Sequence, residues 1–402
     1  TQQTSEEKEK ASERESMMLV TEYAQQFYQD CLWNTGTGKA IGLTYFKERG
    51  FSDDTIRHFG LGYNPDSWDA FTSAALKEGY QLEFLEKTGL TIVKEAPREG
   101  QPERRFDRFK GRVLFPIHSM SGRVLGFGGR TLSADKKQAK YLNSPESEIY
   151  HKSKVLYGIY YAKQAIARED VCYLVEGYTD VIQLYQSGIE NVVASSGTAL
   201  TPEQIRLIRR LTQNIVVLFD GDAAGLRASL RGVDLILEAG MNVRVCTFPE
   251  GEDPDSFARE HSQDAIEAYL KENTRDFIQF KTALLTEEAA ADPIRKAEMV
   301  RDIVSSIARI PDRIKREIYV QECASLMGIS EEVLFNTLAQ MGRKKASEAA
   351  RKPARKELQV VAPGPEDSRV DIQYELEKKI IEMLLLYGRQ TEEFEDLVLK
   401  EN

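Results

Sequence analysis

Cysteine is scarce in this sequence, and its spacing excludes a zinc ribbon. The 402 residues contain Cys31, Cys172, Cys246 and Cys323 as their only cysteines, and no two of them form a Cys-x-x-Cys pair. Structural zinc sites need such closely spaced ligands, so we expect no zinc in this chain. Because Cys172 and Cys246 fall inside predicted strands, we expect the cysteines to be buried as small hydrophobic side chains.

Long apolar runs are also lacking. No segment approaches the roughly 18 apolar residues of a membrane span, and no secretory signal precedes the first charged residues. With 29% charged residues, 41% hydrophobic residues and a formal net charge of −10, we expect a soluble cytosolic protein with no membrane partner. Its length favours roughly two to four domains. The first residue is Thr1 rather than Met, as in a fragment or a processed chain.

One basic segment stands out in this acidic chain. Residues 101–165 contain 13 Lys and Arg against 5 Asp and Glu, a local excess of +8. Such asymmetry is typical of a surface that follows a nucleic-acid backbone. Within it, RFKGRVLFPIHSMSGRVLGFGGRTL alternates like antiparallel strands that turn at Ser121-Gly122. Glycines 126, 128 and 129 carry no side chain, so we expect a ligand backbone to approach closely there.

Carboxylates follow three predicted strands in the middle of the chain. The segments are VCYLVEGYTD, NIVVLFDGDAAG and VRVCTFPEGEDPDSF, and the acids we select from them are Glu176, Asp220, Asp222, Asp253 and Asp255. Strands that alternate with helical patterns predict βαβ units and a parallel sheet. The carboxyl ends of such strands face one crevice, so these acids are expected to converge. All-oxygen clusters suit Mg²⁺ or Mn²⁺, which predicts a divalent-metal site for phosphoryl chemistry.

Blander interpretations exist for each motif. A single Asp after a strand often caps the next helix, and Asp-x-Asp also occurs in aspartyl-phosphate phosphatases. Gly221 allows a tight turn that would aim Asp220 and Asp222 the same way, and the three acidic segments together favour metal binding. NTGTGKAIG lacks the spacing of a phosphate-binding P-loop. The run SSGT at 195–198 either contacts a phosphate or turns the chain.

In this order, the three acidic segments resemble the TOPRIM domain of topoisomerases and bacterial primases. VEGYTDVIQLYQSGIENVVASSGTALTPEQ, VVLFDGDAAG and GEDPDSF are similar to DnaG-type bacterial DNA primases, and the similarity extends over residues 16–340. The resemblance implies a core that makes RNA primers from ribonucleoside triphosphates on a single-stranded DNA template. That family usually carries an N-terminal zinc module, which we do not find in this sequence.

The resemblance also assigns roles to individual residues. Glu176 matches the essential glutamate of the family, with Asp220 and Asp222 beside it in catalysis. Metal ligands, direct or through water, would be Glu176, Asp220, Asp222, Asp253 and Asp255. Nucleotide or DNA would be held by Arg49, Arg130, Lys140, Tyr141, Asn143 and Lys152, where basic groups and an aromatic ring suit a single strand.

We expect an α/β protein in several parts. These are a disordered leader or linker (1–15), a basic α+β lobe (16–165), a TOPRIM parallel-sheet domain (166–261), a helical bundle (262–345) and a charged linker (346–369). Residues 370–402, with VDIQYELEKKIIEMLLLYG, resemble the start of the family's helicase-binding region. Because that region is short here, we expect weak docking of a replicative helicase.

Two other function classes use similar residues. A TOPRIM nuclease or a topoisomerase-like enzyme needs the same acids, but a topoisomerase also needs a tyrosine nucleophile on a separate DNA-clamping domain, and no segment here resembles one. A non-catalytic DNA-binding scaffold would gain nothing from convergent carboxylates, which repel one another. We therefore favour primer synthesis.

Overall fold

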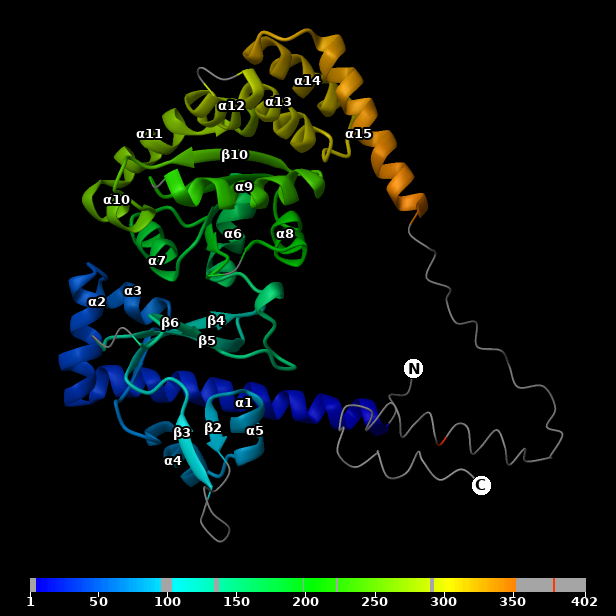
Figure 1. Ribbon diagram of the computed structural model, residues 1–402. Helices are drawn as coiled ribbons and strands as arrows, with labels where there is room; N and C mark the ends of the chain where they lie inside the picture. Colours follow the sequence, from blue (N-terminus) through cyan, green and yellow to red (C-terminus); the bar gives the residue numbers. More distant parts are fainter. Residues whose placement is uncertain are drawn as a thin grey trace, which may run out of the picture. The chain divides into compact units, whose positions relative to one another are not determined.

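The computed structural model describes residues 5–94, 103–133, 137–197, 199–221, 223–289, 293–351 and 379 (Figure 1). Contacts divide the chain into two compact units, Thr1–Lys345 and Ala346–Asn402. Nearly all described residues belong to the first unit. None of the helices in the described part of the chain combines the length and hydrophobicity that a bilayer crossing requires.

The N-terminal lobe is built around an antiparallel sheet. Its strands are β1 (Gly62–Asn64), β4 (Arg112–His118), β5 (Val124–Thr131) and β6 (Tyr141–Asn143), in the order β1-β4-β5-β6. A separate hairpin pairs β2 (Thr91–Lys94) with β3 (Arg104–Asp107). The helices are α1 (Ser5–Asn34), a π-helix (Gly38–Leu43), α2 (Thr44–Glu48), α3 (Asp53–His58), α4 (Ala70–Lys77) and α5 (Leu82–Lys87). The predicted β4–β5 hairpin is confirmed, with Gly122 at a φ of +92° in its turn.

Helix α1 differs from the predicted disordered leader over residues 1–15, because it begins at Ser5. Its charged first half has partners in the lobe. Arg123 bonds Glu15 and Glu22 at 2.7 Å each, and Lys87 lies 3.4 Å from Glu13. These ion pairs give an otherwise polar segment a reason to continue the helix, which the local composition did not indicate.

Strand β4 is buried along its whole length because both faces of the sheet are covered. Val113, Phe115 and Ile117 point into a cluster that also contains residues of the second domain. Leu114 points the other way, into a cluster with Tyr28 of α1. The alternation of a strand thus connects α1, the sheet and the second domain.

The second domain is a mainly parallel α/β sheet, as predicted. Strands β7 (Cys172–Val175), β8 (Val192–Ala194), β9 (Asn214–Phe219) and β10 (Asn242–Thr247) run parallel in the order β8-β7-β9-β10. The helices are α6 (Ile159–Glu169), α7 (Tyr178–Gln186), α8 (Pro202–Arg209), α9 (Ala223–Glu238) and α10 (Pro254–Glu260). The chain runs from β7 to β8 on one side and then crosses to β9 on the other. The crevice at the carboxyl ends of β7 and β9 is therefore the switch point where ligands bind in such folds.

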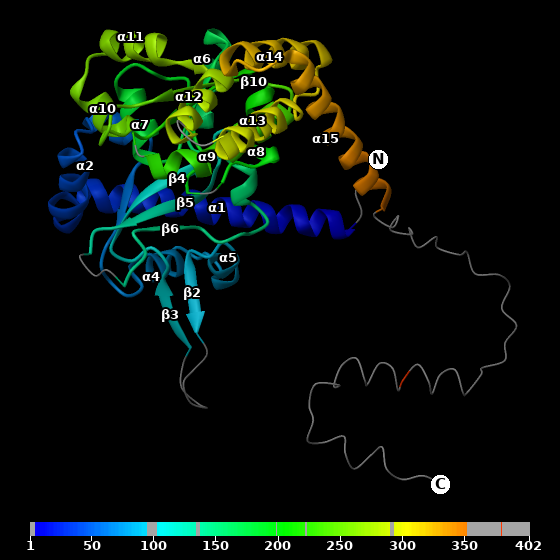
Figure 2. The same cartoon turned by 45° about the horizontal axis from the view of Figure 1, so that its top comes forward.

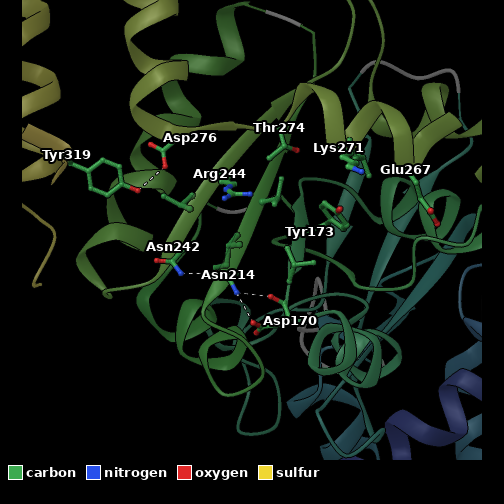
Figure 3. Close-up of a pocket in the computed structure, with 15 residues that line it drawn as sticks. Asp170, Tyr173, Asn214, Asn242, Arg244, Glu267, Lys271, Thr274, Asp276 and Tyr319 are labelled. Carbon is green, nitrogen blue, oxygen red and sulfur yellow. Dashed lines mark hydrogen bonds between the residues drawn. The ribbon is translucent and has the colours of Figure 1, made fainter. Parts of the chain in front are cut away.

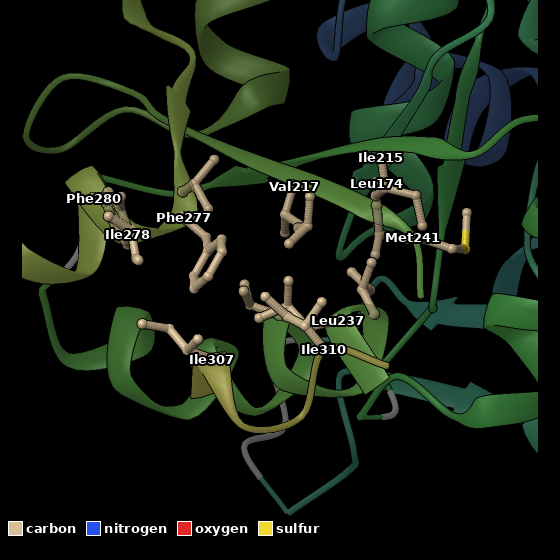
Figure 4. Packing of buried hydrophobic residues seen from close by; sticks show 14 of the residues in the cluster. Leu174, Ile215, Val217, Leu237, Met241, Phe277, Ile278, Phe280, Ile307 and Ile310 are labelled. Atoms are coloured by element: carbon tan, nitrogen blue, oxygen red, sulfur yellow. The ribbon is translucent and has the colours of Figure 1, made fainter. Parts of the chain in front are cut away.

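The C-terminal helices are less separate than the predicted bundle over 262–345. They are α11 (Gln263–Asn273), α12 (Phe277–Ala289), α13 (Pro293–Ile307), α14 (Arg313–Met327) and α15 (Glu331–Arg351), and β11 (Arg275–Asp276) pairs with β10. Helix α12 packs against β10, and α13 and α14 pack against α12 (Figures 1 and 2). Phe277 and Ile307 share one core with Leu174 and Val217 of the sheet (Figure 4). Helix α15 continues into the predicted linker 346–369, and residues 370–402 apart from Lys379 lie outside the described residues.

Buried small residues confirm one expectation and correct another. All four cysteines are buried and free, as predicted. The glycines of β5, by contrast, face protein rather than a ligand. A Cβ atom would lie 2.4 Å from the Tyr178 ring at Gly128, 2.6 Å from Phe109 at Gly129 and 2.8 Å from Ser144 at Gly126. The expected approach of a ligand backbone was therefore wrong, because side chains of the protein occupy that space.

This packing predicts that Gly128→Ala destabilises the fold. The new methyl group would overlap the Tyr178 ring, so we expect the free energy of unfolding to fall by about 1–3 kcal/mol. Chemical denaturation of parent and variant measures it. Gly36→Ala is the control, because nothing lies within 4 Å of its Cβ position. Equal stability of Gly128→Ala and the parent would contradict tight seating of Tyr178.

Candidate active site

The predicted acids lie at the carboxyl ends of the parallel strands. Glu176 follows β7 and Asp220 follows β9, and both are exposed. Asp253 and Asp255 begin α10, after β10. Asp222 lies outside the described residues. The backbone N–H of Gly221 donates to the carbonyl of Glu252 at 3.0 Å, so the turn after β9 lies against the loop that leads to α10.

The missing side chain of Gly221 explains this contact. A Cβ atom at this position would lie 2.1 Å from the carbonyl oxygen of Pro249. Only glycine allows the two loops to approach so closely. Besides the tight turn expected from its sequence, Gly221 thus lets the Asp220 turn touch the loop that carries Asp253.

Asp180 is a further member of the acidic group, and the sequence analysis did not select it. Its carboxylate is 8% exposed and accepts a hydrogen bond from the backbone N–H of Gly177 at 2.8 Å. Its pKa is raised to about 7, mainly by burial, with the charges of Asp220, Asp253 and Asp255 adding to the rise and the Gly177 hydrogen bond opposing it. Carboxylates from three strand ends therefore act on one another. Asp180 stands at the third position of α7, where an acid is also typical of a capping box.

Capping accounts for part of the pattern at α10. Asp253 is the N-cap, and its Oδ1 accepts from the N–H of Ser256 at 2.7 Å. The capping interpretation is thus correct for Asp253, although its charge also acts on Asp180. Asp255 is different, because it is 5% exposed and forms an ion pair with Arg49. Burial raises the pKa of Asp255, and Arg49 opposes that shift.

The basic lobe brings several predicted residues together around Tyr45. Arg130 donates to the Tyr45 hydroxyl, and its guanidinium lies 4.8 Å from the Tyr45 ring centroid and 5.8 Å from that of Tyr141. The guanidinium of Arg49 lies 5.7 Å from the Tyr45 ring centroid. Lys140 is exposed beside β6. Tyr45 was missed in the sequence, because a tyrosine in a short amphipathic helix carries no distinctive signal.

Asn143 and Lys152 contact the turn after β8. The Asn143 amide donates to the carbonyl of Ser196, and the Lys152 ammonium donates to that of Gly197, each at 3.3 Å. The Tyr178 hydroxyl donates to the Asn143 side chain at 2.8 Å. The described part of the 195–198 run is therefore a turn whose carbonyls bind the N-terminal lobe.

Two cavities lie at opposite edges of the parallel sheet. One of about 500 Å³ is lined by Glu176, Ser195, Gly197, Phe219 and Arg231, at the carboxyl ends of the strands. The other, of about 680 Å³, lies at the amino ends and is shown in Figure 3. There the Asn242 amide donates to Asn214, which donates to Asp170. Although the second cavity is larger, none of the predicted acids that the structure describes lines it.

The donor set of the acidic group fits a hard divalent cation. No three His, Cys, Asp or Glu side chains within the described ranges stand close enough to hold a metal ion, but Asp222 is not among them. Asp255 Oδ1 is buried without a well-formed hydrogen bond to any described residue, although Thr179 helps to lower the carboxyl pKa. Repelling carboxylates and such an oxygen suit Mg²⁺ or Mn²⁺, which prefer oxygen ligands.

Comparison with known protein families finds three matches. A model described as the DNA primase catalytic core, N-terminal domain, matches residues 27–163, and a Toprim-like model matches residues 173–258. A model described as the DnaB-helicase binding domain of primase matches residues 279–332. That last match lies within the helices α12 to α15, ahead of the segment 370–402.

Individual relatives agree with these families. The chain is 36% identical to a DNA primase of Halalkalibacterium halodurans and 35% identical to one of Staphylococcus aureus, over 80% and 82% of this chain. Each match covers 53% of the relative, so the chain spans about half of its length.

Solved structures are similar over most of this chain. A DNA primase domain from Pseudomonas aeruginosa has a TM-score of 0.70 at 35% identity, covering 80% of this chain and 99% of that one. A DnaG primase catalytic domain bound to ssDNA has a TM-score of 0.69 at 32% identity, with the same coverage.

The pKa of Asp180 predicts a pH dependence of stability. Its folded pKa of about 7 lies above the unfolded value, so ionisation of this group opposes folding increasingly as pH rises through that interval. With a chelator present, the free energy of unfolding of Asp180→Asn should therefore rise relative to that of the parent by about 2–3 kcal/mol as the pH is raised from 5 to 8. Denaturant unfolding of both proteins at pH 5 and at pH 8 measures this difference in stability.

The control for this experiment is Asp54→Asn, at an exposed position of α3. If Asp180 acted only as a cap, Asp180→Asn would be less stable than the parent by about 1 kcal/mol at both pH values. A stability difference that does not change with pH would contradict the raised pKa of this buried carboxyl.

Proposed function

Because this chain belongs to the DnaG-type bacterial DNA primase family, we propose that it is an RNA-polymerising core. It would synthesise short RNA primers from ribonucleoside triphosphates on single-stranded DNA during replication, in the cytoplasm. The observation that carries this proposal is the ion pair of Arg49 with Asp255, where the cationic surface of one lobe meets the carboxylates at the strand ends. A polymerase needs these two surfaces next to each other, one for phosphates and one for metal.

The residues divide the work by charge. Glu176, Asp220, Asp222, Asp253 and Asp255 would hold the divalent cation, most simply Mg²⁺, with Asp180 behind them. When bound, such a cation stabilises the charge of the attacking and leaving oxygens. Glu176, exposed at the end of β7, would take the proton from the 3′-hydroxyl of the growing primer. Arg49 would hold the triphosphate, and Arg130, oriented by the Tyr45 hydroxyl, would hold a phosphate of the template beside it.

The template would follow the exposed part of the basic lobe. Lys140 is exposed, and Tyr141 beside it is 38% exposed and lies under Arg130. A cation that neutralises backbone charge next to a ring that stacks on a base is the arrangement that single strands favour. The relative described as bound to ssDNA supports this assignment.

One assay separates this proposal from its rivals. The chain is incubated with a single-stranded template, the four ribonucleotides and Mg²⁺. Short RNA products support the proposal, cleaved DNA indicates a TOPRIM nuclease or topoisomerase-like enzyme, and binding without products indicates a scaffold. Asp220→Asn should abolish the RNA products, which excludes a contaminating polymerase.

The metal site predicts how Asp220→Asn affects stability. The substitution removes a ligand and also a repelling charge, so without metal the variant should melt no lower than the parent. Saturating Mg²⁺ should stabilise the parent by about 2.7 kcal/mol at a hundred times its dissociation constant and the variant by less. Melting curves with and without Mg²⁺ test this. A variant that is destabilised without metal and still synthesises primers would refute the site.

The template track predicts a change in salt dependence. Arg130→Ala and Lys140→Ala should each weaken single-strand binding and reduce the slope of log affinity against log salt by about 0.7, the value for one lost phosphate contact. Fluorescence anisotropy at several salt concentrations measures both quantities. Lys296→Ala, an exposed lysine of α13, is the control. If affinity and slope are unchanged in both variants, the basic segment 101–165 is a solvated surface and does not bind the template.

For the helicase, we infer a contact through α14. Ile314 and Ile318, one turn apart, are 72% and 58% exposed, and the matched helicase-binding model includes both. Ile314→Asp should weaken binding of a purified replicative helicase about tenfold, because charge in an apolar contact is costly. Leu19→Asp, at an exposed leucine of α1, is the control. Unchanged binding in a pull-down titration would move the contact elsewhere, for example to residues 370–402.

A further inference from the structure

The ion pair between Arg49 and Asp255 joins residues that are 206 positions apart in the sequence and belong to different lobes. Arg49 is the C-cap of α2, and the chain turns directly after it at Gly50, whose φ is +83°. The side chain of Gln186 holds this turn on α7. Its amide nitrogen donates to the carbonyl of Gly50 at 2.9 Å, and its oxygen accepts from the N–H of Ser52 at 2.8 Å. The guanidinium is therefore presented to Asp255 by a fixed backbone.

The surroundings of Asp255 show why a cation is needed there. Its side chain is 7% exposed and that of Arg49 is 25% exposed. A buried carboxylate without a counter-charge is costly, and the charge of Asp253 repels it as well. Arg49 bonds Oδ2, while Oδ1 has no well-formed hydrogen bond to a described residue. One oxygen is thus neutralised from the N-terminal lobe, and the other is left for a different ligand.

We propose that Arg49 is an internal counter-cation of the acidic site, which neutralises Asp255 while no divalent ion is bound and competes with that ion for it. The inference rests on the proposed function, because it takes Asp255 as a metal ligand. Binding of the ion weakens the hold of Asp255 on the guanidinium and frees Arg49 for the triphosphate of the incoming nucleotide. Metal and nucleotide binding are thereby coupled through one side chain, and this coupling is reciprocal.

The competition gives Arg49→Gln opposite effects on two ligands. Removing the cation should tighten Mn²⁺ binding in the absence of nucleotide about tenfold, and it should weaken nucleotide binding in the presence of Mn²⁺. A merely structural role would weaken both. Mn²⁺ binding to the full chain is measured by electron paramagnetic resonance of the free ion, and nucleotide binding by titration of a fluorescent ribonucleotide.

Further variants separate charge from folding. Arg49→Lys keeps the charge and should retain an Mn²⁺ affinity near that of the parent. Gln186→Ala releases the turn that presents Arg49, so it should tighten Mn²⁺ binding about threefold. This variant provides the test if Arg49→Gln does not fold. In an Asp255→Asn background, Arg49→Gln should have no further effect. Arg57→Gln, whose guanidinium lies 3.7 Å from the Trp33 ring centroid, is the control for removing an arginine.

The outcomes distinguish this inference from the proposed function. If Asp220→Asn binds Mn²⁺ as tightly as the parent does, the metal site and the proposed function both fail. If Asp220→Asn weakens binding but neither Arg49→Gln nor Gln186→Ala tightens it, the counter-cation role alone is overturned. Tighter Mn²⁺ binding in Arg49→Gln that disappears in the Asp255→Asn background supports it.

Discussion

The seating of Tyr178 in the N-terminal sheet is the contact on which the candidate site depends. Its ring stacks on Phe115 at 5.1 Å between centroids and covers Gly128, and its hydroxyl donates to Asn143. Tyr178 follows Glu176 by two residues, so the anchor also fixes where the strand end of β7 stands relative to the basic lobe. A flexible joint at this point would leave the acids and the cations without a defined distance, and preorganised charge is what such catalysis requires.

The two lobes carry opposite charges, which meet where the lobes contact each other. The parallel sheet collects carboxylates because each of its strands ends at the same edge. The antiparallel lobe presents cations from α2 and β5, held by aromatic rings. Burial raises the pKa of Asp180, and the charges of the neighbouring acids raise it as well. The ion pair of Arg49 with Asp255 is the described point at which the two sets neutralise each other.

Much of this arrangement could be predicted from local pattern. The hairpin at Gly122 and the α/β sheet both follow from short-range signals, and the structure has each of them. The acids after β7, β9 and β10 were selected because they follow apolar runs. Predictions that depended on which distant side chains contact a residue were less successful. Glycines 126, 128 and 129 pack against protein side chains, and α1 begins at Ser5, inside the segment 1–15 that was expected to be disordered, because its charges find partners in the lobe.

The sequence determined which residue types are available and where along the chain each element ends, because propensity, periodicity and turn chemistry act over a few neighbours. Only the tertiary structure decided the partners. Asp180 joined the acidic group, Tyr45 came to support Arg130, and Arg49 met Asp255 across the two lobes. Those pairings depend on packing between segments that are far apart in the sequence, 85 positions for Tyr45 and Arg130 and 206 for Arg49 and Asp255, and on the burial that strengthens every charge they contain. No local pattern carries that information.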